Sequence, residues 1–238
     1  MLMRLENGFL DLDPLHLPAT GSGPLSGLRF AVKDVIDVAG TVTGLGHPLW
    51  RSTHAPAASN ADCVVRLLAA GAELIGKTHT DELTYSLSGQ NAHYGMPPNP
   101  AVPNAVPGGS SSGSASVTAA GLVDFAIGTD TGGSVRVPAS FCGIYGLRPT
   151  HGAVDNRGVA QLAHSFDTVG WFARDARILR AVGHVLLPPS HGLRLQRVRM
   201  IREASIVVAP ELSVQAEQWL ATPGFPLICE KQQPPWGF

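Results

Sequence analysis

The sequence predicts an α/β domain in which helices cover a β-sheet, and three observations lead to this class. Strand-like and helix-like segments alternate between residues 28 and 76. A further apolar run, over 125–128, ends in a glycine-rich loop that precedes a proline-opened helix. At 238 residues and 44% hydrophobic content, the chain can bury one large core. Strands that alternate with helices favour a sheet on which those helices pack.

The first part of the domain contains two predicted strands. Residues 28–32 form an apolar run, and apolar residues continue over 35–38 into a turn. A second, short strand is predicted over 73–76. The segment 1–26 ends in a Gly-Ser-Gly-Pro turn, so the domain is expected to begin at residue 27.

A helix is predicted between these strands, over 61–70. Ser59 is the expected N-cap, and Gly71 follows the last turn as the expected stop. Its buried face is expected to consist of Val64, Val65, Leu67 and Leu68.

The middle of the chain, 107–149, predicts a loop, a helix, a strand and a second loop. The helix is expected over 114–121, where alanine and serine allow close packing, and the strand over 125–128. A sharp loop over 129–134 follows, and Pro138 suits the first turn of the next helix.

Two glycine–serine clusters, over 108–113 and 131–134, flank this helix and strand. Glycine inside an element costs about 0.5–1 kcal/mol relative to alanine, so packing does not explain them. Phosphate binding is disfavoured, because no lysine lies between Lys77 and Lys231 and the P-loop pattern is absent.

A serine nucleophile is favoured, but the region holds no histidine to activate it. Lys33, at the end of the first strand, is the clearest base, since burial disfavours a charged lysine.

Five motifs then resemble the amidase signature family. They occur in that family's order and read Ala31-Val32-Lys33-Asp34, Gly76-Lys77-Thr78 with Asp81-Glu82, Pro107-Gly108-Gly109-Ser110-Ser111, Gly128 to Arg136, and Gly146 to Thr150. Segments at 91–95, 151–154 and 165–175 resemble the branch with plant indole-3-acetamide hydrolase and its bacterial relatives. The resemblance spans 27–187 and implies an amidase-signature fold, with a mixed β-sheet covered by helices.

The resemblance implies a Ser-Ser-Lys triad. Ser134 corresponds to the nucleophile that forms the acyl-enzyme, Ser110 to the bridging serine and Lys33 to the base. A cis peptide bond is expected between Gly109 and Ser110. The backbone N–H groups of Thr131, Gly132, Gly133 and Ser134 are expected to form an oxyanion hole. No cofactor and no metal ion is assigned.

The function that follows is hydrolysis of a small-molecule carboxylic amide, with an aryl-acetamide such as indole-3-acetamide as the suggested substrate and small aliphatic amides as the other option. One alternative is an amidotransferase subunit that supplies ammonia to aminoacyl-tRNA together with a partner subunit. The segments at 91–95 and 151–154 favour the stand-alone amidase. Another alternative is a non-catalytic amidase-like binding module, although no triad residue has been lost.

Composition sets the remaining expectations. A net charge of −1 provides no field for nucleic acid or an anionic membrane. The three cysteines predict no disulfide framework, and Cys142 is expected to be a buried apolar residue. Without a signal peptide or an eighteen-residue apolar run, a cytoplasmic location is expected.

Several polar side chains are expected to have structural roles. Lys77 is expected to pair with Asp81 or Glu82, while Thr129 and Asp130 are expected to orient the glycine loop. Arg136 is equally compatible with a substrate carboxylate and with Asp130. Ser111 and Ser112 are expected to bond the loop or cap the helix, and His93, His151 and His164 are expected to be structural.

The segment 188–238 is expected to be divergent or truncated. A helix is predicted over 211–221, and four arginines before it, Arg194, Arg197, Arg199 and Arg202, are expected to form a solvated helix face. A sheet cut short would expose an edge, so a homo-oligomer is one expected outcome.

Overall fold

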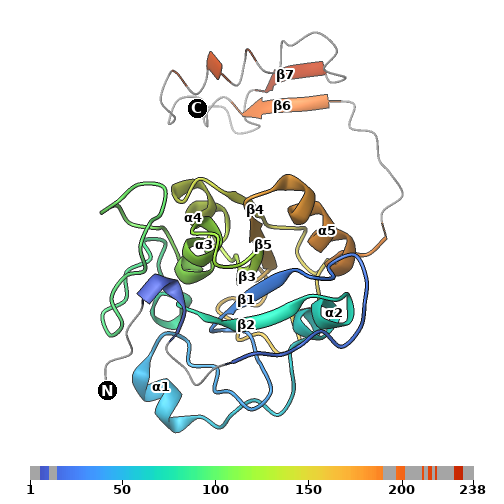
Figure 1. Ribbon diagram of the computed structural model, residues 1–238. Coiled ribbons are helices and arrows are strands. Elements are labelled where there is room, and N and C mark those ends of the chain that lie inside the picture. Colours follow the sequence, from blue (N-terminus) through green and yellow to red (C-terminus); the bar gives the residue numbers. More distant parts are fainter. Residues whose placement is uncertain are drawn as a thin grey trace. The chain divides into compact units, whose positions relative to one another are not determined.

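The computed structural model describes residues 6–10, 15–189, 197–201, 211, 214–215, 218 and 228–232. The chain divides into two units, and the boundary along the chain lies between Pro188 and Pro189 (Figure 1). Each unit is described by itself below.

The first unit contains a five-stranded mixed sheet with the strand order β2-β1-β3-β5-β4. Its strands are β1 (Arg29–Lys33), β2 (Glu73–Thr78), β3 (Phe125–Thr129), β4 (Tyr145–Leu147) and β5 (Val169–Ala173). Strand β1 runs parallel to both β2 and β3, whereas β5 runs antiparallel to β3 and to β4. The mixed α/β architecture agrees with the predicted fold class.

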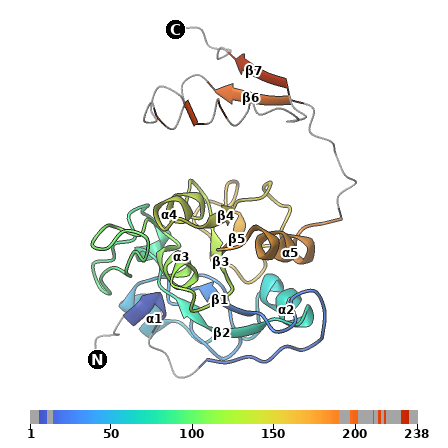
Figure 2. The ribbon, with the colours of Figure 1, turned by 45° about the horizontal axis from the view of Figure 1, so that its top comes forward.

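Helices lie on both faces of this sheet (Figures 1 and 2). The faces are covered by the helices α2 (Asp62–Ala69), α3 (Ser112–Ala119), α4 (Arg136–Phe141) and α5 (Ala176–Leu186). The unit also contains the helix α1 (Pro48–Thr53) and the 3₁₀ turns η1 (Glu6–Gly8) and η2 (Glu82–Thr84). Within the described residues, none of these helices is long and apolar enough to cross a membrane.

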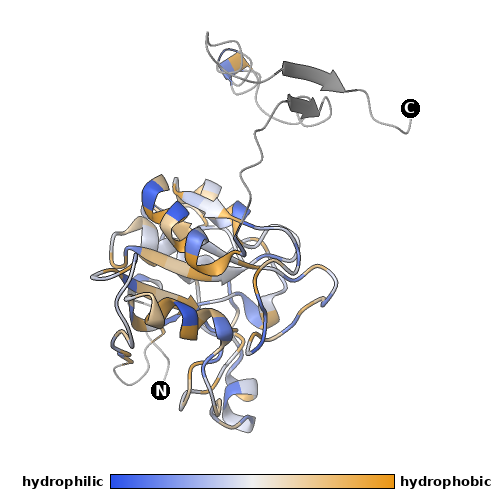
Figure 3. Ribbon diagram, turned by 90° about the vertical axis from the view of Figure 1, so that its right-hand side faces the viewer, coloured by the Kyte–Doolittle hydropathy of each residue, from blue (hydrophilic) through white to orange (hydrophobic). Residues whose placement is uncertain are grey.

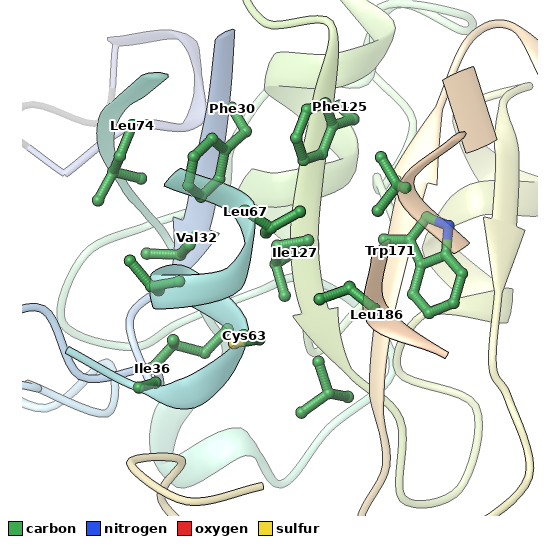
Figure 4. Packing of buried hydrophobic residues seen from close by; sticks show 14 of the residues in the cluster. Phe30, Val32, Ile36, Cys63, Leu67, Leu74, Phe125, Ile127, Trp171 and Leu186 are labelled. Atoms are coloured by element: carbon green, nitrogen blue, oxygen red, sulfur yellow. The ribbon is translucent and has the colours of Figure 1, made fainter. Parts of the chain in front are cut away.

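The larger core lies between the sheet and the helices α2 and α5 (Figure 4). Alternate side chains of each strand point to opposite faces, so Phe30 and Val32 join this core while Ala31 faces α3. In β3, Phe125 stacks on Phe30 with ring centroids 5.2 Å apart. Small residues on the α3 face allow that helix to approach the strands closely. Figure 3 shows hydrophobic colours along the strands and hydrophilic patches on the surrounding helices.

Helix α2 forms where it was predicted, but two details differ. Ala61, not Ser59, is the N-cap residue, and it makes no side-chain cap bond. Val65 is 50% exposed, and Cys63 takes its place on the buried face. One residue rotates a helix by about 100°, which carries position 65 out of the stripe at 64, 67 and 68. Gly71 does follow the helix end, with φ +100°.

Helix α3 starts two residues before the predicted position and ends two residues before the predicted end. It is buried on nearly all sides, so it has no polar stripe from which its start could be read. Its hydroxyls instead satisfy neighbouring groups: Ser114 Oγ donates to the carbonyl of Ile127 at 3.0 Å. Pro138 lies in the first turn of α4, as predicted.

The second unit contains the parallel strands β6 (Arg197–Ile201) and β7 (Ile228–Gln232). The prediction of an arginine-bearing helix face is therefore wrong for Arg197 and Arg199, which lie in β6. Arg194, Arg202 and most of the helix predicted over 211–221 lie outside the described residues. Over 197–200, arginine alternates with valine and methionine, a period-two pattern typical of a strand.

Candidate active site

Lys33 and Thr129 end two adjacent parallel strands, β1 and β3. The carboxyl ends of parallel strands meet at one edge of the sheet, which is where α/β proteins form their sites. Lys33 Nζ donates hydrogen bonds to Ser110 Oγ at 2.7 Å and to Thr129 Oγ1 at 2.9 Å. The lysine therefore joins one predicted serine directly to the end of a central strand.

The Lys33 ammonium is completely buried, with 0% exposure. Burial lowers the pKa of Lys33 from 10.5 to about 7, although the carboxylates of Asp81, Asp130 and Asp167 oppose this shift. Desolvation outweighs the carboxylates because none of them contacts the amine. A substantial neutral fraction, able to accept a proton, is therefore present near pH 7.

Ser110 lies in the turn that precedes α3. The peptide bond between Gly109 and Ser110 is cis, as predicted. The carbonyl of Ser110 accepts a hydrogen bond from the backbone N–H of Asp81 at 3.2 Å. A Cβ at position 109 would lie 2.3 Å from the Asp81 carboxylate, so only glycine allows this contact. The Asp81 segment thus fixes the backbone that carries Ser110.

The two serines after Ser110 hold the turn in place, as predicted. Ser111 Oγ donates to the carbonyl of Thr129 at 3.1 Å and accepts from the Thr129 N–H at 3.2 Å. Ser112 Oγ is hydrogen-bonded to His79 Nδ1 at 2.9 Å. Burial lowers the pKa of His79 to about 4, and the Lys33 charge acts in the same direction. His79 is consequently neutral at physiological pH.

Asp130 organises the glycine loop, in agreement with its predicted role. Its carboxylate accepts hydrogen bonds from the backbone N–H groups of Gly133, Val135 and Arg136 at 2.8–3.2 Å. The Arg136 guanidinium binds the same carboxylate through Nε and Nη2. Burial opposes ionisation of Asp130, but these hydrogen bonds outweigh it and keep its pKa below the ordinary value. Arg136 therefore holds the loop, which is the second of its two predicted roles.

The backbone donors predicted for an oxyanion hole divide into two groups. The Gly133 N–H already donates to Asp130, so the structure removes it from the predicted set. The N–H groups of Thr131, Gly132 and Ser134 have no acceptor within the described part of the chain. Three of the four predicted donors are therefore available to a ligand.

Ser134 lies beside the Ser110 turn. Its carbonyl accepts a hydrogen bond from the Ser111 N–H at 3.2 Å, which ties the two serine clusters together. The residue is 5% exposed, and its hydroxyl makes no hydrogen bond to any described residue. It lines an open pocket of about 320 Å³ together with Thr84, Tyr85, Ser86, Leu87, Thr131, Gly132 and Leu162.

Lys77, a second buried lysine, has a different environment. Its Nζ pairs with Asp34 Oδ1 at 2.8 Å, and Arg51 Nη2 pairs with Asp34 Oδ2 at 2.8 Å. Lys77 does form a salt bridge, but the predicted partners, Asp81 and Glu82, are wrong. Asp34 directly follows β1, which runs parallel to β2, so the carboxylate comes from the end of the neighbouring strand and not from the turn after β2.

Three residues around Lys33 have contacts that the sequence interpretation missed. Thr129 donates no charge but accepts a hydrogen bond from Lys33. Its position at the end of the predicted strand over 125–128 could have indicated this contact. Asp81 and Asp167 contribute charge from loops distant in sequence. Asp167 accepts a hydrogen bond from Thr131 Oγ1 at 2.6 Å, which links its loop to the glycine loop.

Comparison with known proteins finds relatives of this chain. The amidase family model matches residues 14–206. "Amidase 1" of Oryza sativa subsp. japonica is 57% identical over 180 residues, which cover 76% of this chain and 41% of that protein. "Translocon at the outer membrane of chloroplasts 64" of Pisum sativum is 55% identical over 174 residues, 73% of this chain and 29% of that protein.

A solved structure of native peptide amidase from Stenotrophomonas maltophilia superposes with a TM-score of 0.76. It is 30% identical, and the match covers 88% of this chain and 48% of that one. The chain thus spans less than half the length of each of these three proteins.

Proposed function

The chain belongs to the amidase family, and on that premise we propose that it hydrolyses a carboxylic amide to the acid and ammonia. The proposed triad is Ser134 as nucleophile, Ser110 as proton bridge and Lys33 as base. One observation carries the proposal: a fully buried lysine donates a 2.7 Å hydrogen bond to a buried serine beside a glycine-rich loop.

The reaction would proceed through an acyl-enzyme. Neutral Lys33 accepts the proton of Ser110, Ser110 accepts the proton of Ser134, and Ser134 Oγ attacks the amide carbon. The proton then returns through Ser110 to the nitrogen, which leaves as ammonia from a primary amide. A water molecule attacks the ester by the same proton route and restores the free serine.

The oxyanion would be stabilised by backbone N–H groups. Thr131, Gly132 and Ser134 have donors that no described residue uses, and each such donor typically contributes about 2.7–4 kcal/mol in the transition state. Asp130 supports this role indirectly, because it fixes the loop through Gly133, Val135 and Arg136.

We further propose an aryl-acetamide as substrate, such as indole-3-acetamide, with small aliphatic amides as the other option. The pocket beside Ser134 supports this choice, since Tyr85, Leu87 and Leu162 supply apolar surface for an aromatic ring. Its volume of about 320 Å³ lies at the lower end of the range of small-molecule sites.

The experiment that tests the proposal is ammonia release from indole-3-acetamide by the purified chain, run beside a Ser134→Ala variant. We expect release by the wild-type chain and none above background by the variant. Circular dichroism of both proteins provides the folding control. If the folded wild-type chain released no ammonia from indole-3-acetamide, acetamide or other simple amides, the proposal would be refuted for this chain.

An amidotransferase subunit that supplies ammonia to aminoacyl-tRNA is the second candidate within enzymes. It would show glutaminase activity only after addition of its partner subunits. A non-catalytic binding module is the candidate from another class, and the Pisum sativum relative gives a reason to test it. Retention of Lys33, Ser110 and Ser134 favours catalysis over both a module and a purely structural domain.

The remaining proposals concern partners and location. We propose a small-molecule amide as the ligand, with neither nucleic acid nor membrane as a partner, and a homo-oligomer as one possible assembly. A cytoplasmic location also remains a proposal. Size-exclusion chromatography with light scattering tests the oligomeric state, and fractionation of expressing cells tests the location.

A further inference from the structure

Three side chains from separate loops converge away from the triad. They are His47, which precedes α1, Glu82, which opens η2, and His93, in the turn at 91–95. One ligand atom from each lies within 4.8 Å of the others. We propose that this cluster, the His47–Glu82–His93 site, binds a divalent transition-metal ion of the zinc class.

The distances within the cluster are compatible with metal coordination. His47 Nε2 and His93 Nε2 each lie 3.3 Å from the same carboxylate oxygen, Glu82 Oε1. Two ligands at about 2.0–2.2 Å from zinc in a tetrahedron lie about 3.3–3.5 Å apart. Ordinary N–H···O bonds cluster near 2.9–3.0 Å, so 3.3 Å is long for two such bonds to one oxygen.

The donor set also suits zinc and its neighbours in the first transition series. Two imidazoles and one carboxylate are ligands that zinc accepts, and they leave a fourth position for water or another molecule. The two rings meet edge to face with centroids 4.6 Å apart, so the imidazoles lie directly against each other beside the carboxylate. The three side chains are 24–40% exposed, which allows an ion to enter.

The loops that carry these ligands are fastened to one another. Buried Asn91 donates to the carbonyls of Gly46 and Thr80, and its Oδ1 accepts from the His93 N–H. Because these groups neighbour the three ligands in sequence, one side chain fixes all three loops. This scaffold holds the ligand atoms together before any ion arrives.

The backbone beside the ligands is strained. Leu45, Leu83 and Thr84 have positive φ, at +52°, +46° and +64°, and they are three of the five non-glycine residues with positive φ in the described part of the chain. The N–H of Leu83 donates to the carbonyl of Leu45 at 2.8 Å, which joins the strained segments directly. Such conformations are costly and persist where the surroundings enforce them, often at binding sites.

Metal binding requires a proton to move in both imidazoles, and at His47 it also breaks a hydrogen bond. His47 Nδ1 accepts a 3.3 Å hydrogen bond from the Trp50 N–H, which in the neutral ring leaves the proton on Nε2. Coordination through Nε2 moves this proton to Nδ1 and breaks that long cap bond. His93 Nε2 faces the same carboxylate oxygen at 3.3 Å, so its proton also moves to Nδ1 on coordination, but His93 Nδ1 makes no hydrogen bond to a described residue that this would break. Because each imidazole must release the proton on its Nε2 to bind an ion, the site takes up a metal ion in exchange for protons.

The site lies next to the proposed substrate pocket along the chain. Glu82 opens the 3₁₀ turn that ends at Thr84, and Thr84 with Tyr85 lines the pocket beside Ser134. A bound ion would therefore hold one wall of that pocket. This consequence rests on the proposed function, whereas the binding itself does not.

The test is calorimetric titration of Zn²⁺ into the chelator-treated full chain at pH 7.5. We expect one ion per chain. His93→Gln and Glu82→Gln should each weaken Zn²⁺ binding at least about tenfold. Replacing a residue that only hydrogen-bonds to a metal ligand already lowers metal affinity by about that much. His16→Gln is the matched control, because His16 also contacts a glutamate, Glu73, but without a second imidazole.

A second measurement uses Co²⁺ as a spectroscopic probe. Tetrahedral Co²⁺ absorbs visible light far more strongly than the hexaaqua ion, so the wild-type chain and His16→Gln should develop strong bands that Glu82→Gln lacks. Absence of stoichiometric Zn²⁺ binding by the wild-type chain would overturn the proposal. So would undiminished binding by folded His93→Gln, or loss of binding in His16→Gln.

Discussion

Lys33 Nζ lies 2.7 Å from Ser110 Oγ, and neither residue has any exposed surface. The other close partner of the amine, Thr129 Oγ1, is also a neutral hydroxyl. Three carboxylates act on Lys33 from a distance, but none contacts it. A buried amine surrounded by hydroxyls is stabilised in its neutral form, which is the form that a base requires.

The first prediction concerns the pH dependence of hydrolysis. Burial lowers the pKa of Lys33 to about 7, and the base form exists above that value. We expect kcat/KM for amide hydrolysis to increase with pH, about tenfold per unit below pH 7, and to level off above it. Initial rates between pH 5.5 and 9 measure this profile. A flat profile, with a solvent isotope effect that shows chemistry to be rate-limiting, would contradict the role of Lys33.

The second prediction contrasts two buried lysines. Lys33→Met should abolish hydrolysis, with a loss of at least about 10³-fold, while the protein stays folded. Lys77→Met removes a partner of Asp34 and should lower the free energy of unfolding by about 3 kcal/mol, the lower end for a broken buried pair, because Arg51 remains. Urea denaturation measured beside activity distinguishes the two. Equal destabilisation by both changes would contradict this division of roles.

A related pH effect on stability serves as the control for that pair. Between pH 7 and 10.5 the unfolded chain protonates Lys33 while the folded chain does not. The free energy of unfolding should therefore increase with pH across this window. Below pH 7 the folded chain also holds the proton, so the full cost of burying the charged amine remains. In Lys33→Met this contribution to the slope should disappear.

The sequence predicted the central elements because their signals are local. Strand β3 was recognisable from its apolar run and Gly71 from its position after the helix, whereas the exposure of Val65 and the start of α3 depended on packing. The triad residues came from family motifs. Thr129 as a lysine partner, the pairing of Lys77 with Asp34 and the engagement of the Gly133 N–H required the spatial order of the strands.

The third prediction concerns Asp130. Asp130→Asn removes the charge that three backbone N–H groups and Arg136 share, so the glycine loop should loosen. We expect kcat to fall at least about tenfold, because the oxyanion donors lose their orientation, and unfolding stability to fall by about 2 kcal/mol. Steady-state kinetics and thermal unfolding measure both effects. Unchanged kcat in the folded variant would contradict the loop's proposed role.

Protonation of Asp130 should also lower the free energy of unfolding at acidic pH. Its folded-state pKa lies below the ordinary value, so its contribution is present above about pH 4 and is lost as pH falls through the folded pKa. In Asp130→Asn the free energy of unfolding should decrease less steeply as the pH falls below about 4 than in the wild-type chain. An identical decrease in both proteins would show that Asp130 makes no such contribution.

The last prediction concerns substrate size. Leu87 and Leu162 line the pocket beside Ser134 and are both partly exposed, which allows either to be shortened without opening the core. Leu162→Ala should raise KM for indole-3-acetamide about tenfold, because an apolar pocket typically loses about that much affinity with one or two methylene contacts. The kinetic constants for acetamide should change by less than about twofold. Val102→Ala is the matched control, because Val102 is 53% exposed and does not line the pocket. Equal losses with both amides would indicate a general disturbance of the site, and no change with either would place the aromatic ring elsewhere.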